Sequence, residues 1–207
     1  MKRFLVRVVA GATAVVALSG CIKLDMDMKI KSNDKIDGSV IVGFSSQLIE
    51  MMGQKKDEFI KEMQKSVKTS DLPKGAKTST YDKNGFVGTK ISFKDMPASD
   101  FSKATGVAAG AAASTSGGAS SDDFKLVKKD GKWNFTGTMD LKGTGTKGGS
   151  PDLSALGSSV KAEVRVKLTF PGKITKHDKA GKVDGKSITW SPKMGEKINM
   201  QATAESK

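Results

Sequence analysis

The stretch IKLDMDMKIK, residues 22–31, decides much of the fold because apolar and charged side chains alternate strictly along it. A period of two residues places successive side chains on opposite faces of a β-strand. We therefore predict a strand with one buried and one solvated face. The buried side chains on it would be Ile22, Leu24, Met26, Met28 and Ile30.

A second stretch, VKAEVRVKLTF at residues 160–170, shows the same alternation. Shorter strand-like segments flank Asn84-Gly85 and Asp130-Gly131. Both dipeptides are typical of tight β-hairpin turns. Nearly all the expected strands are joined by short turns, which favours antiparallel pairing.

One region, between residues 48 and 67, replaces the two-residue period with a helical one. Its apolar positions are Leu48, Ile49, Met52, Phe59, Ile60, Met63 and Val67. Gly53 either splits this helix into two or only weakens it. The sequence therefore predicts an α+β fold, with a curved antiparallel sheet or partial β-barrel of about 8–10 strands packed against one main helix region.

The first 20 residues have the layout of a secretory signal. Lys2, Arg3 and Arg7 precede an uncharged, mostly apolar run from Val8 to Leu18. That run is shorter than the about 20 residues needed to span a bilayer. Its end, Leu18-Ser19-Gly20-Cys21, resembles a bacterial lipobox, in which the cysteine becomes the lipidated mature N-terminus. The alternative is an ordinary signal peptide with an incidental cysteine.

The 207 residues carry a formal net charge of +13, and removal of residues 1–20 lowers it to +10. We expect one domain at 21–207, with a flexible low-complexity loop at 106–121 that is a functional lid or simple filler. The basic residues lack interleaved aromatics, which argues against nucleic acid as a partner. They suit residence near anionic lipid, or only keep the chain soluble.

Little in the sequence points to chemistry. With one Cys and one His, a disulfide framework and a Cys/His zinc site are excluded, and we expect no metal and no cofactor. The run from Gly143 to Gly148 matches a dinucleotide fingerprint but lacks the helix that such a site requires. His177 beside Asp178 could belong to a cryptic hydrolase, yet no Gly-x-Ser-x-Gly elbow accompanies it. We expect no enzyme activity.

Several methionines fall on predicted apolar faces, and methionine adapts to irregular contents such as lipid tails. Ordinary core packing is the alternative explanation. The candidate lining of a lipid cavity is Met26, Met28, Met52, Phe59, Met63, Met139 and Met200.

The mature start, from Cys21 to Met28 followed by Asp37-Gly38, resembles that of actinobacterial lipoproteins of the LppM type. The close, from Gly185 to Trp190 followed by Gly195-Glu196, is similar to the end of that domain. The resemblance implies a lipid-binding-like α+β domain on the outer face of the bacterial plasma membrane. A mycobacterial member is associated with phosphatidylinositol mannosides. Family members often continue into a C-terminal membrane helix, and none is expected here.

We therefore expect a lipid-anchored, non-catalytic envelope protein. It would attach to the plasma membrane through Cys21 and bind a phosphatidylinositol-type glycolipid or another anionic lipid in an apolar cavity. The alternative is a scaffold or interaction module of an envelope protein complex. The sequence carries no signal for an oligomeric state.

Overall fold

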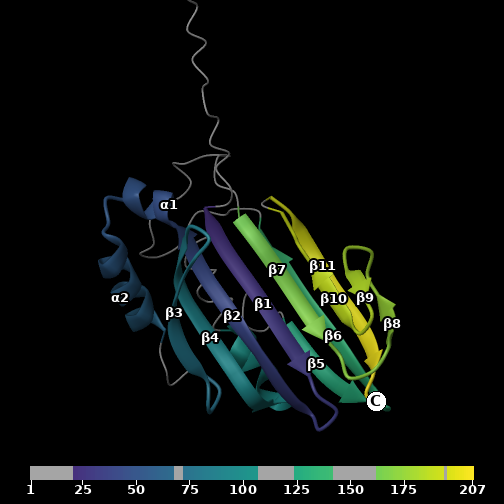
Figure 1. The fold of residues 1–207 in the computed structure, drawn as a ribbon. Helices are drawn as coiled ribbons and strands as arrows, with labels where there is room; N and C mark the ends of the chain where they lie inside the picture. The colour runs from purple at the N-terminus through teal and green to yellow at the C-terminus, as the bar shows by residue number, and fades with distance from the viewer. Residues whose placement is uncertain (1–20, 68–71, 107–123, 142–161, 194) are drawn as a thin grey trace, which may run out of the picture.

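A computed structural model describes residues 21–67, 72–106, 124–141, 162–193 and 195–207. Two β-sheets form most of it (Figure 1). The larger sheet contains, in spatial order, β3 (Lys77–Lys83), β4 (Phe86–Pro97), β2 (Lys35–Ser45), β1 (Ile22–Ile30), β7 (Ala162–Thr169), β10 (Ser187–Trp190) and β9 (Lys182–Asp184). The smaller sheet contains β5 (Phe124–Lys129), β6 (Lys132–Asp140), β11 (Lys197–Glu205) and β8 (Ile174–His177).

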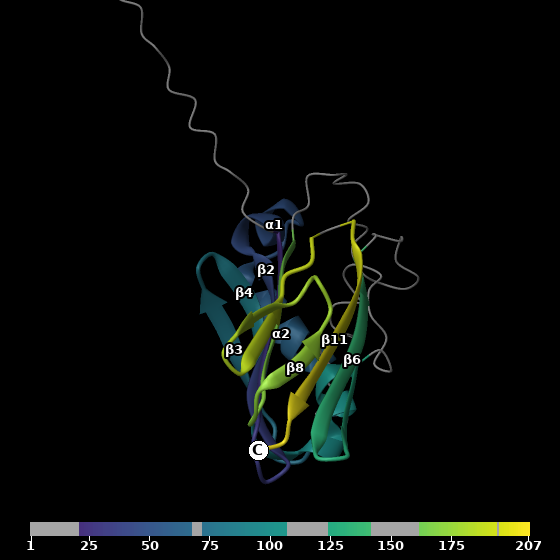
Figure 2. The ribbon, with the colours of Figure 1, turned by 90° about the vertical axis from the view of Figure 1, so that its right-hand side faces the viewer.

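The two sheets lie face to face, as the edge-on view shows (Figure 2). Helices α1 (Ser46–Met51) and α2 (Lys56–Ser66) follow β2, and α2 contacts β3 and β4. A 3-10 turn, η2 (Ala98–Asp100), leads into helical residues 101–106. The larger sheet therefore has one covered face and one solvated face, as the alternation in β1 predicts.

The predicted hairpins are confirmed, and their turn residues explain them. Asn84 and Gly85 have φ angles of 56° and 77°, and Asp130 and Gly131 have φ angles of 52° and 70°. Two consecutive left-handed residues are what a two-residue hairpin turn needs, because they match the twist of the flanking strands. Glycine and short polar side chains tolerate this conformation best.

The predicted helix region is split in two at Gly53, which has a φ of +70°. A residue with a side chain would be strained in this conformation, which suits glycine at the end of a helix. The Ser45 side chain caps α1 by accepting a hydrogen bond from the Leu48 backbone N–H at 3.2 Å.

The α+β class is confirmed, and the described residues add three details that the sequence did not give. There are two sheets instead of one, they hold eleven strands, and four of these strands follow Phe170. The expectation of antiparallel pairing fails at one place, since β1 and β7 run parallel. Residues 1–20, the run from Gly143 to Gly148 and almost all of the loop at 106–121 lie outside the described residues.

The parallel pair has a ladder of opposite charges on the face turned away from the core, which we call the charge ladder: Lys23, Asp25, Asp27, Glu163, Arg165 and Lys167. Lys23 faces and pairs with Glu163. Arg165 donates two hydrogen bonds to the Asp25 carboxylate, from Nε at 2.9 Å and from Nη2 at 3.0 Å. Lys167 faces Asp27, with Nζ and Oδ2 3.8 Å apart. Opposite charges on facing residues stabilise a strand pair.

Asp25 and Arg165 should therefore couple energetically. We expect a double-mutant cycle with Asp25→Asn and Arg165→Gln to give a coupling of about 1 kcal/mol, because the contact is bidentate and partly buried. Urea unfolding of the four proteins measures it. The control cycle uses the exposed cross-strand pair of Asp140 and Lys197, 3.8 Å apart. A coupling for Asp25 and Arg165 no larger than this control would contradict the role given to the ladder.

Candidate functional site

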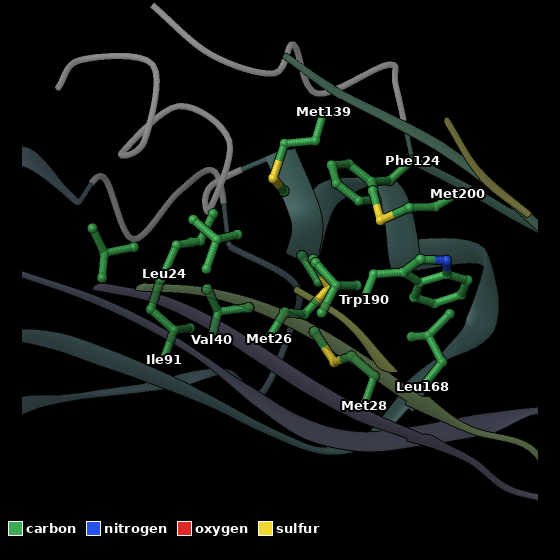
Figure 3. Packing of buried hydrophobic residues seen from close by; sticks show 14 of the residues in the cluster. Leu24, Met26, Met28, Val40, Ile91, Phe124, Met139, Leu168, Trp190 and Met200 are labelled. Carbon is green, nitrogen blue, oxygen red and sulfur yellow. The ribbon is translucent and has the colours of Figure 1, made fainter. Parts of the chain in front are cut away.

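Four of the seven candidate cavity residues lie between the sheets (Figure 3). Met26 and Met28 project from β1 on the larger sheet, and Met139 and Met200 project from β6 and β11 on the smaller sheet. The period-two pattern predicts their faces correctly. Methionines therefore contribute to both walls of the space between the sheets.

Two of these methionines face a glycine on the neighbouring strand. Met28 faces Gly38, where an added Cβ would lie 2.6 Å from the Met28 sulfur. Met200 faces Gly137, where an added Cβ would lie 3.0 Å from the Phe124 ring. The missing side chains make room for bulky neighbours inside the space.

The space beside the four methionines is filled. Met28 and Met200 are 0% exposed, Met26 is 1% exposed and Met139 is 2% exposed. An open cavity large enough for water would leave accessible area on the side chains that line it. A ligand could therefore reach these four residues only by displacing packed side chains.

The other three candidate residues lie on the helix side of the same apolar cluster. The Phe59 ring of α2 packs edge-on against Phe44 of β2, with centroids 5.2 Å apart. Met52 and Met63 are only partly buried, and so is Ile60 of α2. Apolar side chains are thus less completely covered here than between the sheets.

A buried hydroxyl without a partner lies in β4 on the same side. The Thr89 Oγ1 makes no hydrogen bond within the described structure, although the residue is only 3% exposed. Thr89 faces Thr80 of β3, whose hydroxyl accepts a hydrogen bond from Gln64 of α2 at 2.9 Å. An unpaired buried hydroxyl costs about 1–3 kcal/mol, so it calls for an explanation.

A chain of aromatic rings closes the other side of the space between the sheets. Phe135 of β6 lies 5.3 Å from Trp190, 6.2 Å from Phe124 and 6.0 Å from Phe101, measured between centroids. These contacts join β10, the smaller sheet and the helical segment after η2 into one rigid wall. Trp133 of β6 adds a second buried polar atom, Nε1, without a hydrogen bond among the described residues.

Asp178 holds the Trp190 side chain in place by a hydrogen bond from outside the apolar space. Its carboxylate accepts hydrogen bonds from Trp190 Nε1 at 2.9 Å and from the backbone N–H groups of Gln201, Ala180 and Gly181. Partial burial raises the pKa of Asp178, but these four donors outweigh it and leave the pKa below the ordinary value of an aspartate. This role of Asp178 is not predicted from the sequence, although Asp followed three residues later by Gly is a turn signal.

His177 takes no part in a catalytic triad among the described residues. The side chain is exposed on β8, and its Nδ1 lies 2.7 Å from the backbone oxygen of Asp178. The carboxylate of Asp178 is committed to Trp190 and backbone groups instead. The described residues also hold no group of three or more metal-ligating side chains.

Cys21 lies immediately before β1. It is a free cysteine, buried, and its backbone oxygen accepts a hydrogen bond from Ser45 N–H at 2.8 Å. This contact places Cys21 beside the start of α1. Within the part of the chain that the structure describes, no helix is long and apolar enough to cross a membrane.

The fold and site define an α+β domain whose methionine-containing apolar interior is enclosed by two sheets and a pair of helices. The model of the LppM domain family matches residues 23–206, and the chain belongs to this family. The solution NMR structure of the folded domain of LppM from Mycobacterium tuberculosis has a similar fold, with a TM-score of 0.59 and 16% identity over 90% of each chain. The search of curated proteins gives no match. Family membership points to a membrane-associated envelope protein.

Asp178 gives a pH-dependent prediction. We expect Asp178→Asn to lower the free energy of unfolding at pH 7 by about 2 kcal/mol, because hydrogen bonds to a charged group are lost. The lowered folded-state pKa means that the wild-type contribution is present above the unfolded pKa and is lost as the pH falls through the folded value.

Chemical unfolding at a series of pH values measures this effect. The variant should lose less stability than the wild type below about pH 4. Asp184→Asn removes one exposed carboxylate from β9 and serves as the control. Parallel acid profiles for wild type and Asp178→Asn would contradict the assignment.

Proposed function

We propose that this chain is a non-catalytic, lipid-anchored protein of the bacterial cell envelope. Cys21 attaches it to the outer face of the plasma membrane, and the domain binds an acyl chain of a lipid or glycolipid between α2 and the larger sheet. The observation that carries the proposal is the incomplete apolar cover of Met52, Ile60 and Met63 on the continuous interior cluster.

Three features support this location for the acyl chain. Methionine side chains rearrange at low cost, which suits a guest of irregular shape. The unpaired Thr89 hydroxyl is a hydrogen-bond donor for an ester or hydroxyl group at the head of the chain. The space between the sheets is already filled, so the helix side is the easier route inward.

The scaffold alternative stays a prediction without a specific observation in its favour. It calls for an exposed apolar or charged patch. The large exposed apolar residues among those described are Met51, Val127 and Val183, and they lie on three separate elements, α1, β5 and β9. Single apolar residues on a surface are ordinary.

A charge placed under α2 should weaken lipid binding strongly. We expect Ile60→Glu to reduce the lipid bound to the purified protein at least about tenfold, because a carboxylate beside an acyl chain is poorly solvated. Native mass spectrometry of protein gently extracted from membranes measures the bound lipid. Val127→Glu adds the same charge at an exposed apolar position of β5 and should leave the lipid content unchanged.

Thermal unfolding of both variants separates lost binding from lost folding. If Ile60→Glu unfolds, Met52→Glu repeats the test. Met52 follows α1 and lies outside α2, so this substitution should destabilise α2 less. Lipid-free wild-type protein, or equal lipid content in Ile60→Glu and Val127→Glu, would overturn the proposed binding site.

The anchor can be tested separately. We expect the intact mass of the wild-type protein from membranes to correspond to a chain that begins at Cys21 and carries a two-chain lipid, since two chains are about what stable attachment needs. Cys21→Ser should lose both the lipid mass and cleavage at this position. A wild-type chain with an unmodified thiol would contradict the anchor and leave the lipid-binding proposal intact.

A further inference from the structure

The outward face of the smaller sheet is built largely from uncharged polar side chains. Phe135, Met139 and Met200 of β6 and β11 are buried against the larger sheet, so the alternate residues of these strands point away from the core. Figure 2 shows β6 and β11 on the side of the domain away from β2 and β4. We call six of the outward residues the amide–hydroxyl array: Asn134, Thr136, Thr138, Asn199, Gln201 and Thr203.

The array has a regular order across the pairing of β6 with β11. Residues on the same face of one strand lie about 6.8 Å apart, so its three rows extend over about 14 Å along the strands. A ligand that contacts all of the rows must therefore be extended. Each row places one threonine opposite one amide side chain: Asn134 faces Thr203, Thr136 faces Gln201, and Thr138 faces Asn199.

Two hydrogen bonds orient the amide groups at the ends of the array. The Thr138 hydroxyl donates to Asn199 Oδ1 at 3.1 Å, and the Thr203 hydroxyl donates to Asn134 Oδ1 at 3.1 Å. Because each amide oxygen accepts this bond, the amide NH2 group is left as a donor and the hydroxyl oxygen as an acceptor. Donors and acceptors thus stand side by side, which matches a sugar, whose hydroxyl groups also do both.

Contact with water alone does not account for a neutral array in this chain. Charged residues make up 28% of the sequence, and the larger sheet carries the charge ladder on its own outward face. On the smaller sheet the charged pairs stand only beyond the two ends of the array. Asp140 faces Lys197 at one end, and Lys132 faces Glu205 at the other.

The border of the array is basic. Both outward acidic residues face a lysine, so three of the five outward lysines remain as a surplus: Lys125 and Lys129 on β5, and Lys176 on β8. These two strands flank β6 and β11 on opposite sides. Lys125 faces Thr136 and Lys176 faces Thr203, so both adjoin the array directly. A ligand that carries carboxylates suits this border.

The side chains of this face do not suit other classes of partner. Val127 is the one large exposed apolar residue among those described on β5, β6, β8 and β11. Protein interfaces are anchored by aromatic and arginine side chains, and single-stranded nucleic acid stacks on aromatic ones. The array contains neither type.

We propose that the amide–hydroxyl array binds an extended acidic polysaccharide that carries no lipid. The sugar hydroxyl groups exchange hydrogen bonds with the three rows, and carboxylates of the polymer pair with Lys125 and Lys176. This ligand is distinct from the acyl chain proposed at α2, because α2 contacts β3 and β4 of the larger sheet. The binding chemistry depends neither on that site nor on the proposed anchor.

Isothermal titration calorimetry on the detergent-solubilised protein tests the proposal, with polygalacturonate as the probe and dextran as a neutral polymer. We expect saturable binding of polygalacturonate and weaker binding of dextran. Asn199→Ala/Gln201→Ala keeps the net charge and should weaken binding at least about fivefold, because two hydrogen-bonding groups are lost. The control Ser39→Ala/Ser92→Ala removes a facing pair of hydroxyl groups from the larger sheet and should bind like the wild type.

The basic border is tested with Lys125→Gln/Lys176→Gln. This double variant should weaken binding and reduce its salt dependence more than Lys61→Gln/Lys65→Gln, which removes the same charge from exposed positions on α2. Thermal unfolding of every variant checks the fold. Absence of saturable binding, or an equal effect of the two alanine double variants, would overturn the proposal. Dextran binding as tight as that of polygalacturonate would refute the acidic ligand.

Vesicles of phosphatidylglycerol separate a polymer site from a membrane site. Asn199→Ala/Gln201→Ala should bind these vesicles like the wild type. A loss as large as that for polygalacturonate would assign the array to lipid headgroups and contradict the proposal. Acyl-chain binding at α2 is measured independently with Ile60→Glu, so the failure of either proposal leaves the other standing.

Discussion

The rest of the structure depends on the pairing of β1 with a strand on each side. It is antiparallel to β2 over nine residues and parallel to β7 over eight. Its even-numbered side chains enter the core, and Lys23, Asp25 and Asp27 contribute to the charge ladder. A slip of one residue would exchange these two faces, placing aspartates in the core and methionines in water. One strand therefore fixes the register of the larger sheet and the identity of its buried face.

Local patterns predict the local structure well, and distant pairing is where the sequence falls short. Asn84-Gly85 predicts a hairpin because the two strands that pair, β3 and β4, are adjacent in the chain. The partner of β1 lies 140 residues away, and charge alone does not fix its direction. An antiparallel register with Asp25 facing Lys167, Asp27 facing Arg165 and Lys29 facing Glu163 would also pair opposite charges. The two strands pair in parallel, and no periodicity in either segment encodes that direction.

The candidate site shows the same division. Alternation places Met26, Met28, Met139 and Met200 on the correct faces, because a strand has only two. Whether the facing layers leave a cavity depends on what the opposite wall contributes, and the aromatic chain around Phe135 fills it. The unpaired Thr89 hydroxyl and the bonds of Asp178 to Trp190 arise only when separate strands meet. Neither could be predicted from one segment.

These constraints also decide where the domain can open. Separating the sheets would expose the four methionines and the ring cluster, and each fully buried large side chain contributes about 1.5–3 kcal/mol. Lifting α2 exposes fewer groups, and Ile60 and Met63 already lie partly in solvent, so each loses less than that amount. Regions with little buried apolar area open at lower free energy than the core. An acyl chain in the proposed site would replace these contacts and offset much of the cost. The rigid pairing around β1 thus confines adaptability to the helix side, beside the end of the sheet where Cys21 lies.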